Sequence, residues 1–451
     1  MEPVNLLRIV VVVLACLGAL SLTVPGRPQT ATGRGAPYPG TSPESLAELE
    51  AKLQEAPQDH ETLYDLAAAY YWGAGDPDSA QPVYERLLRV NPEHWLAHYD
   101  LGHLLNTRGR HTQALHHWKR FLKLHPERSG QANRVREMVS WYESLTTQRG
   151  EPVASKGWEV EGDTVTNSIG MVFVRIPGGE STMGYAGGKH DQRPEHVVAL
   201  DPYWMGKYGV TAGQFRRFLQ ESGYRSYARF VRSPVNKYSR TEDHPVVFLT
   251  WHAATALTVW LSSRERAVYS LPSEAEWELA ARGSDGRTNR WGNSNAEPGK
   301  HGNLGRFDRI TRAGELPTVE EVGSCPAGAS PFGLLDMAGN ADEWCLDWYH
   351  PDFYGSSPER NPFGPVHMEG RAHRVLRGEN WRFRPGRTHA VQRNHFDRTA
   401  PYDCFGFRIV RELDAAERWA SRLQPGTEPY GNGPAPAACT TMEESPPLVE
   451  L

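Results

Sequence analysis

The order of apolar and polar residues predicts a helical array over 44–150. Apolar positions recur there with helical spacing, and the pattern repeats itself. Three positions recur 34 residues apart, as the pairs Ala80 and Ala114, Tyr84 and Trp118, and Pro92 and Pro126. Another set recurs with one extra residue, Leu66, Ala67 and Tyr70 returning as Leu101, Gly102 and Leu105. We expect two helical hairpins, with helices at about 44–56 and 129–147 covering their exposed apolar ends.

This pattern resembles the tetratricopeptide repeat. In such a repeat a small residue lies where two helices cross, an aromatic residue follows on the second helix, and a proline closes the unit. The resemblance implies a concave surface that binds a protein or peptide partner. A plain spacer that holds the following domain away from a membrane is the alternative.

The sequence pattern changes over 156–412, where it predicts short strands and turns that alternate with a few helices. The spacings Thr211 to Gln214 and Ser273 to Glu276 both fit a capping box, which opens a helix. Each predicted helix ends near a glycine, at Gly223 and Gly283. The Pro-, Glu- and Ser-rich region 413–451 is expected to be a disordered tail.

The N-terminus carries an uncharged apolar run over 9–24 with no amphipathic period. We interpret 1–24 as a signal anchor and the Pro- and Gly-rich stretch 25–43 as a linker. The rest of the chain would then lie outside the cytoplasm, in a periplasm, in a secretory lumen or on a cell surface. Secretion after cleavage of the signal is the alternative.

Composition narrows the function classes only slightly. A net charge of -5 over 451 residues gives no general reason to expect nucleic acid as a partner. The five cysteines form no CxxC pair and therefore predict no disulfide framework. Fourteen tryptophans and 43 glycines are typical of a turn-rich fold held by large aromatic side chains.

The stretch GLLDMAGNADEW, at 333–344, has the composition of a metal loop. Asp336 and Glu343 flank two small residues, Gly339 and Ala341, whose backbone carbonyls are open. Such a set of oxygens suits Ca²⁺, although the spacing does not fit the helix-loop-helix calcium loop. Alternatively, the two carboxylates only cap neighbouring backbone.

The region 156–412 resembles the formylglycine-generating enzyme, or sulfatase-modifying factor, family. That family has an α+β, turn-rich variant of the C-type-lectin-like fold. Seven stretches carry the resemblance in family order, namely NSIGMVFVRIPGGESTMG, YWMGKYGVTAGQFRRFL, HPVVFLTWHAATALTVWLS, LPSEAEWELAARG, GLLDMAGNADEW, RVLRGENW and GFRIVRE.

The resemblance implies structural calcium. One ion would be held by the side chains of Asp336 and Glu343 and by the carbonyls of Gly339 and Ala341. A second calcium site would begin at Asn303 and Leu304. Its carboxylate does not align cleanly, and Glu315 is the nearest candidate.

The same resemblance argues against the family's copper chemistry. These enzymes oxidise a substrate cysteine with copper held by two thiolates, because soft sulfur ligands stabilise Cu(I). The corresponding positions here are Phe383 and Thr388, so copper is not expected. Nearby, Glu379, Asn380 and Asp342 replace a glycine, a serine and a tryptophan of the family motifs. Cys404 is a single thiol, and we interpret Cys325 and Cys345 as small buried residues or a local disulfide.

We therefore predict a protein that binds a ligand or partner through the former reaction cleft. From Arg371 to Arg411 there are ten arginines against three acids, interleaved with aromatic residues. This composition suits an anionic or extended peptide ligand. Alternatively, the arginines stack on tryptophans and tie loops together. The cleft candidates are Asn380, Trp381, Arg384, His389, Arg393 and His395.

Two other functions stay open. One is an oxidoreductase related to the family that acts on sulfatases or thiol substrates with a different metal. The resemblance to sulfoxide synthases with non-haem iron draws attention to His94, His98 and His103, but their place in the repeat favours a solvated helix face. The other is a partner of a competent homologue in sulfatase maturation. The HExxH, GxxxxGK[ST], GxSxG and GxGxxG motifs are absent from the chain.

Overall fold

The computed structural model describes residues 43–126, 130–146, 159–161, 163–224, 234–305, 318–366, 373–383 and 389–413. The predicted signal anchor, most of the linker and almost all of the tail lie outside these residues. In the part that is described, none of the helices is both long and apolar enough to cross a membrane.

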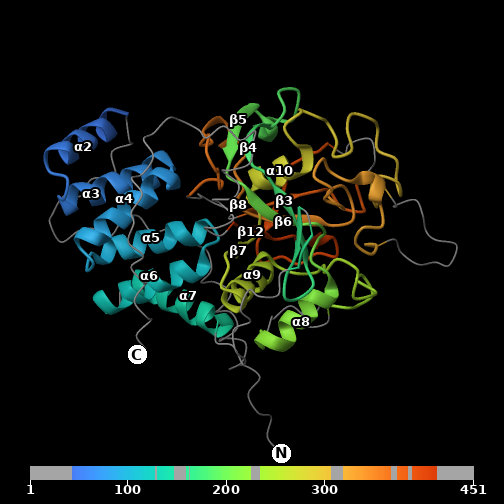
Figure 1. Ribbon diagram of the computed structural model, residues 1–451, viewed down its shortest axis with the longest axis horizontal. Coiled ribbons are helices and arrows are strands. Elements are labelled where there is room, and N and C mark those ends of the chain that lie inside the picture. The colour runs from blue at the N-terminus through green and yellow to red at the C-terminus, as the bar shows by residue number, and fades with distance from the viewer. Residues whose placement is uncertain are drawn as a thin grey trace, which may run out of the picture. The chain divides into compact units, whose positions relative to one another are not determined.

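The first part of the chain is the predicted array of helices (Figure 1). In chain order they are α2 (Pro43–Glu55), α3 (His60–Ala68), the π-helical turn η1 (Ala69–Ala74), α4 (Pro77–Val90), α5 (Trp95–Thr107), α6 (His111–Leu124) and α7 (Gly130–Thr146). The two hairpins α3–α4 and α5–α6 are the predicted repeats, and α2 and α7 flank them. The expected helical organisation is confirmed.

Close packing explains why the repeat needs small and aromatic residues at fixed positions. Ala80, Ala114, Tyr84 and Trp118 are all completely buried. A Cβ atom on Gly102 would lie 2.5 Å from the indole ring of Trp118, so glycine is required for this approach of α5 to α6.

The three histidines of α5 do not form a solvated face, and that expectation is wrong. His94 is the N-cap of α5, and its Nδ1 accepts the Ala97 N–H at 3.1 Å. The Nδ1 atom of His98 lies 2.9 Å from Nδ1 of His117. His103 packs against the ring of Trp118. Buried residues occur on nearly every side of α5, so its histidines contact neighbouring side chains and do not form one exposed face.

The second part is an α+β domain, whose described residues form three sheets. The six-stranded sheet has the order β1-β2-β3-β6-β12-β7, the four-stranded sheet has the order β10-β9-β8-β11, and β4 pairs with β5. The strands are β1 (Glu159–Glu161), β2 (Thr164–Thr166), β3 (Val172–Ile176), β4 (Gly179–Met183), β5 (His196–Leu200), β6 (Tyr203–Gly206), β7 (Tyr269–Ser270), β8 (Asp342–Trp348), β9 (His373–Arg377), β10 (Asn394–Asp397), β11 (Phe405–Gly406) and β12 (Val410–Glu412).

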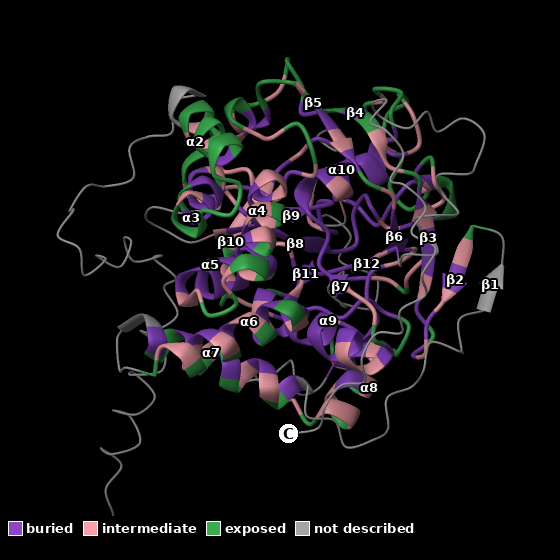
Figure 2. Cartoon of the chain, turned by 60° about the vertical axis from the view of Figure 1, so that its left-hand side comes forward, coloured by how far each residue is buried: buried purple, intermediate pink, exposed green. Residues whose placement is uncertain are grey.

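Among the described residues, the α-helices of this domain are α8 (Ala212–Ser222), α9 (Trp251–Glu265) and α10 (Glu274–Arg282). Both predicted capping boxes are present, at the starts of α8 and α10. Gly223 and Gly283 end these helices with φ angles of 69° and 67°, which glycine adopts without strain. Figure 2 shows that buried residues fill β8, α9 and α10, whereas α2 is largely exposed.

The repeats and the α+β domain belong to one compact unit that extends to Glu412. Helices α6 and α7 pack on α9. The guanidinium group of Arg110, at the start of α6, makes two 2.8 Å bonds to the carboxylate of Glu412 on β12. A Cβ atom on Gly109 would lie 2.4 Å from Cβ of Ser270, so the backbones are in close contact here.

Replacing His111 should make the protein less sensitive to acid. His111 is buried, and burial lowers its pKa to about 3, whereas an unfolded histidine titrates near 6.5. The stability that neutral His111 provides is therefore present above pH 6.5 and is lost as the pH falls towards 3. As the pH falls from 7.5 to 5, the free energy of unfolding of His111→Gln, measured with urea, should rise relative to that of the natural chain by up to about 2 kcal/mol.

The exposed His116 offers a matched control, because its ring stays in water in the folded and unfolded chain. His116→Gln should show no comparable gain. If the unfolding free energies of His111→Gln and the natural chain change with pH in parallel, His111 is not a source of the acid sensitivity.

Candidate functional site

A buried cluster of charged side chains lies beneath α10. The guanidinium group of Arg377, on β9, donates to Glu274 at 2.7 Å and to Glu278 at 2.6 Å. Arg393 bonds both oxygens of Glu274 at 2.8 Å, and Arg282 bonds Glu278 at 2.7 Å. Burial alone would raise the pKa of Glu274 and Glu278, but the arginines hold both pKa values below normal. The carboxylates and guanidinium groups of this cluster are therefore charged, and each charge is balanced by a partner of opposite sign.

Arg393, a predicted ligand-binding residue, is one of these internal ties. Its remaining nitrogen donates to the backbone carbonyl of Asp191 at 2.6 Å, and its guanidinium lies over the ring of Tyr354. Arg374 is likewise stacked, with its guanidinium carbon 4.0 Å from the ring of Trp251 and 3.4 Å from that of Trp348. Stacking and loop-tying thus account for both residues, while Arg384 lies outside the described residues.

The two positions that correspond, by the family resemblance, to copper-binding thiolates are Phe383 and Thr388. Phe383 is partly buried, and its N–H donates to the carbonyl of Asn380 at 2.9 Å. Thr388 lies outside the described residues. Cys345 and Cys404 are buried thiols without a disulfide, and Cys325 is buried as well. Burial, reinforced by nearby carboxylates, raises the pKa of Cys345 and Cys404 well above the ordinary thiol value.

Asp342 and Asn380, where the family motif has other residues, bond each other. The carboxylate of Asp342 accepts the Asn380 amide at 2.6 Å and the Asn394 amide at 3.3 Å. Asp342 is completely buried, and burial raises its pKa to about 7. Its other oxygen has no hydrogen-bond partner among the described residues. Sequence reasoning missed Asn394, which only the pairing of β10 with β9 brings to this place.

A second buried pair lies beside this cluster. Glu379 and Arg290 approach within 3.1 Å, and both side chains are almost completely excluded from solvent. Burial raises the pKa of Glu379 and lowers that of Arg290, so each needs the other. Glu379 also has a φ angle of 54°, which is uncommon for a residue with a side chain. No sequence signal identifies Arg290, which is 89 positions away along the chain.

The remaining cleft candidates do not converge on one point. Trp381 is buried, whereas His389 is exposed and donates its backbone N–H to Glu379 at 3.2 Å. The Nδ1 atom of His395 lies 2.8 Å from that of His373, and its ring stacks on Tyr349. Burial and His373 lower the pKa of His395.

The loop proposed for calcium has an unusual, left-handed backbone at some of its residues. Asp336 has a φ angle of 59° and Gly339 one of 83°. One oxygen of Asp336 accepts the Gly323 N–H at 2.6 Å, and burial raises the pKa of this carboxyl to about 6. A Cβ atom at position 339 would lie 2.5 Å from the carbonyl oxygen of Asn303. Glycine at 339 therefore brings the two segments of the predicted calcium sites into contact.

Glu343, the second carboxylate of this loop, is already bonded to protein. Its Oε2 accepts from Trp277 at 2.7 Å and from Arg408 at 2.5 Å, and its Oε1 accepts from Arg408 at 2.8 Å. Because each carboxylate oxygen has two acceptor positions, Oε1 retains one. A Cβ atom on Gly209 would lie 3.7 Å from this oxygen, so glycine leaves space beside it.

Asn303 gives a second sign of a cation site. Its side chain is 3% exposed, and its amide donates to the carbonyl of Thr318 at 3.0 Å. Its Oδ1 is buried with no hydrogen-bond partner among the described residues. An orphaned buried oxygen fits a calcium ligand. Leu304 follows and is completely buried, while Glu315 lies outside the described residues.

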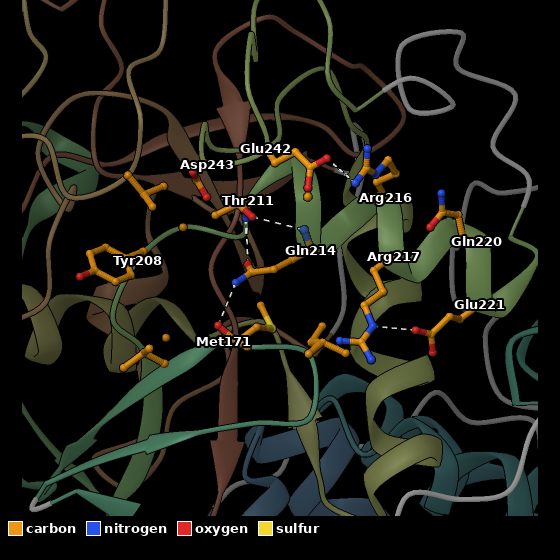
Figure 3. Close-up of a pocket in the computed structure, with 17 residues that line it drawn as sticks. Met171, Tyr208, Thr211, Gln214, Arg216, Arg217, Gln220, Glu221, Glu242 and Asp243 are labelled. Carbon is orange, nitrogen blue, oxygen red and sulfur yellow. Dashed lines mark hydrogen bonds and ion pairs between the residues drawn. The ribbon is translucent and has the colours of Figure 1, made fainter. Parts of the chain in front are cut away.

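A separate cavity of about 640 Å³ opens beside α8. Figure 3 shows Gln214 near its centre and Tyr208 on the opposite wall from Arg217. An ion pair joins Arg216 to Glu242, and another joins Arg217 to Glu221 at 2.6 Å. Ile169, Met171, Val172 and Val322 add apolar surface. Sequence reasoning identified the capping box here but not the cavity, which depends on the turns that face α8.

Comparison with protein families gives two matches. Residues 159–413 match the sulfatase-modifying factor enzyme 1-like domain, and residues 66–129 match a tetratricopeptide repeat. Both resemblances drawn from the sequence are thereby confirmed, as is the order of a helical region followed by an α+β domain.

Individual proteins show the same relationship. The formylglycine-generating enzyme of Streptomyces coelicolor is 34% identical over 256 residues, which cover 46% of this chain and 78% of that enzyme. Serine/threonine-protein kinase Pkn1 of Chlamydia trachomatis is 31% identical over 292 residues, covering 58% of this chain and 42% of the kinase. The chain thus spans less than half the length of that kinase. The structure of PvdO from Pseudomonas aeruginosa aligns with a TM-score of 0.48 and 26% identity, over 56% of this chain and 100% of that one.

Replacing Arg393 should destabilise the fold and not merely weaken a binding site. Arg393→Met leaves the buried carboxylate of Glu274 with one cation fewer, which we expect to cost about 3–5 kcal/mol of unfolding free energy. Urea unfolding measures this. As a control, Arg360→Met breaks an exposed pair with Asp201 and should cost less than about 1 kcal/mol. Equal stability of Arg393→Met and the natural chain would return Arg393 to the list of ligand-binding candidates.

Proposed function

Since the chain belongs, through residues 159–413, to the sulfatase-modifying factor enzyme 1-like domain family, we propose that it uses this domain for binding and not for copper-dependent oxidation of cysteine. The observation that carries the proposal is Phe383 at a position where copper chemistry needs a thiolate. A phenyl ring offers no lone pair to Cu(I), which favours soft sulfur ligands.

The other cysteines do not replace the missing ligands. Cys345 and Cys404 are buried, and burial raises the pKa of both thiols, which disfavours the thiolate form. Thiolates are the species that bind metals. These two residues therefore do not replace the thiolate that is missing at position 383.

The polar residues in and near the RGENW stretch are largely occupied by contacts within the protein. Asn380 and Asn394 both donate to one oxygen of Asp342, and Glu379 forms an ion pair with Arg290. All except the partly buried Asn394 are at most 5% exposed. Because these side chains are mostly buried and paired, we place the ligand elsewhere on the domain.

We assign ligand binding to the cavity beside α8. Its volume of about 640 Å³ is in the usual range for ligand sites. Paired charges of both signs lie at its edge, and Tyr208 and Met171 provide apolar contact. An extended peptide that carries both acidic and basic side chains matches this mixture. The helical repeats supply a second surface for a protein partner, in keeping with the general role of such repeats.

Calcium is proposed as a structural ion of this domain. Asp336, the free position on Glu343 Oε1 and the carbonyls of Gly339 and Ala341 would hold one ion. Asn303 and Leu304 would contribute to the other. The orphaned Oδ1 of Asn303 and the space left by Gly209 support the fit. Calcium would supply positive charge to buried oxygens and would take no part in a reaction.

We also propose that the apolar run 9–24 targets the chain to a membrane as a signal anchor, with the two domains outside the cytoplasm. Fractionation of cells that produce the whole chain, with protease protection, tests the location. Release of a shortened chain into the medium would instead support cleavage and secretion.

Copper provides the direct test of the proposed function. After exposure to Cu(I) and removal of weakly held metal with bicinchoninate, the natural chain should retain no stoichiometric copper. It should also consume no oxygen with a cysteine-containing peptide. Phe383→Cys combined with Thr388→Cys should retain one equivalent, because it restores two thiolates, whereas Phe383→Cys alone should not. One equivalent on the natural chain would overturn the proposal.

Binding at the cavity is tested with the natural chain and a set of octapeptides of varied charge, by fluorescence anisotropy. Gln220→Trp should weaken peptide binding at least tenfold, because the exposed Gln220 lines the cavity and an indole would fill it. Gln220→Ala is the control and should bind as the natural chain does. Peptide binding that Gln220→Trp leaves unchanged would place the ligand elsewhere.

Calcium removal should lower the melting temperature of the natural chain by several degrees. Asp336→Gly should remove that dependence, because glycine accepts the positive φ angle but provides no carboxylate. Asn361→Gly is the matched control, since Asn361 also has a positive φ angle of 42° but lies outside the loop. Identical melting curves in calcium and in chelator would contradict the structural-calcium proposal.

A further inference from the structure

Three potential metal ligands meet at the edge of the helical repeats, far along the chain from the predicted calcium loop. One ligand atom from each of His60, Glu61 and His94 lies within 4.8 Å of the other two. The Nδ1 atom of His60 is 3.5 Å from Oε1 of Glu61. This is close to the separation of two ligands on a tetrahedral ion, given bonds of about 2.0–2.1 Å.

The repeat architecture places these residues together. His94 is the N-cap of α5, just as Asp59 is the N-cap of α3. Because successive repeats stack, the starts of these equivalent helices are neighbours. His60 and Glu61 follow Asp59 directly, and the imidazole of His60 lies 6.3 Å from that of His94 between ring centres.

The ring of His94 is held in position before any ion binds. It stacks on Tyr64 with ring centres 4.9 Å apart, and the hydroxyl of Tyr64 donates to Asp100 at 2.9 Å. Burial lowers the pKa of His94, which favours the neutral imidazole that a metal binds. His60 and Glu61 are exposed, which leaves a path for an ion to enter.

One hydrogen bond competes with metal binding. Nδ1 of His94 accepts the Ala97 N–H, so the neutral ring carries its proton on Nε2. An ion on Nδ1 displaces this bond directly. An ion on Nε2 moves the ring proton to Nδ1, which then no longer accepts. In both cases the helix cap is lost, and we expect this to weaken binding by roughly fivefold to tenfold.

We propose that His60, Glu61 and His94 form a site for a divalent transition metal, with Zn²⁺ as the fitting ion. Two imidazoles and one carboxylate are a common zinc donor set, with water completing the tetrahedron. The bound ion joins the start of α3 to the start of α5. It thereby braces one repeat against the next.

Zinc sulfate added to the metal-free full chain tests the proposal. Isothermal titration calorimetry should show one equivalent bound with micromolar affinity, and the melting temperature should rise with zinc concentration. His94→Asn should weaken this binding at least thirtyfold while keeping an N-cap, because asparagine caps helices well but has no imidazole. His60→Gln, an exposed substitution, should have a similar effect. Affinity should also fall between pH 7.5 and pH 6, as protons compete for the ligands.

His116→Gln is the control for incidental binding to this histidine-rich region, and it should bind zinc as the natural chain does. Absence of zinc binding to the natural chain would overturn the proposal. So would one equivalent that persists unchanged in both His94→Asn and His60→Gln. If His94→Asn fails to fold, His60→Gln decides the question alone.

Discussion

Four charged side chains beneath α10 hold the α+β domain in one arrangement. Glu274 and Glu278 come from the helix, Arg377 comes from β9, and Arg393 directly precedes β10; none is more than 3% exposed. Charges taken out of water are tolerated only when they are paired and hydrogen-bonded. Glu278 also accepts the backbone N–H of Gly184 at 2.9 Å, which ties the end of β4 to the same cluster. The helix, two sheets and a loop are therefore fixed together, because moving any of them would leave a buried charge unpaired.

Other arginines of the domain are buried and paired or stacked in the same way. The arginine-rich composition of 371–411 therefore does not mean that this region is an electropositive cleft. Arg408 is completely buried and bonds Glu343, and Arg374 is stacked between two tryptophans. A run of ten arginines against three acids suggests an electropositive cleft. In the fold, however, the acids that neutralise Arg377, Arg393 and Arg408 come from other parts of the chain. The ligand binding that we propose is placed at the cavity beside α8, where ion pairs with both signs of charge lie near the surface.

The helical repeats are joined to the domain and do not form a detached module. Arg110 bonds Glu412 on β12, so an ionic contact connects the second repeat to the last strand of the larger sheet. Most of α5 is buried, which leaves less open groove than two repeats suggest. Arg110 follows the C-terminal end of α5, whereas the proposed metal site lies at the N-terminal end of α5. The metal and the contact with β12 would therefore act at opposite ends of this helix.

The sequence by itself determined the order of the parts and their local signals. Helical hairpins, both capping boxes, the family and the loss of a thiolate at Phe383 all follow from short-range patterns, because capping, periodicity and ligand chemistry depend on neighbouring residues. Only the tertiary structure decided which polar groups meet. Asn394 reaches Asp342 through the pairing of β10 with β9, and Arg290 reaches Glu379 from 89 positions away. The burial of His98 likewise depends on helix packing. Such contacts are set by chain topology, and a buried charge or imidazole looks the same in sequence as one that faces water.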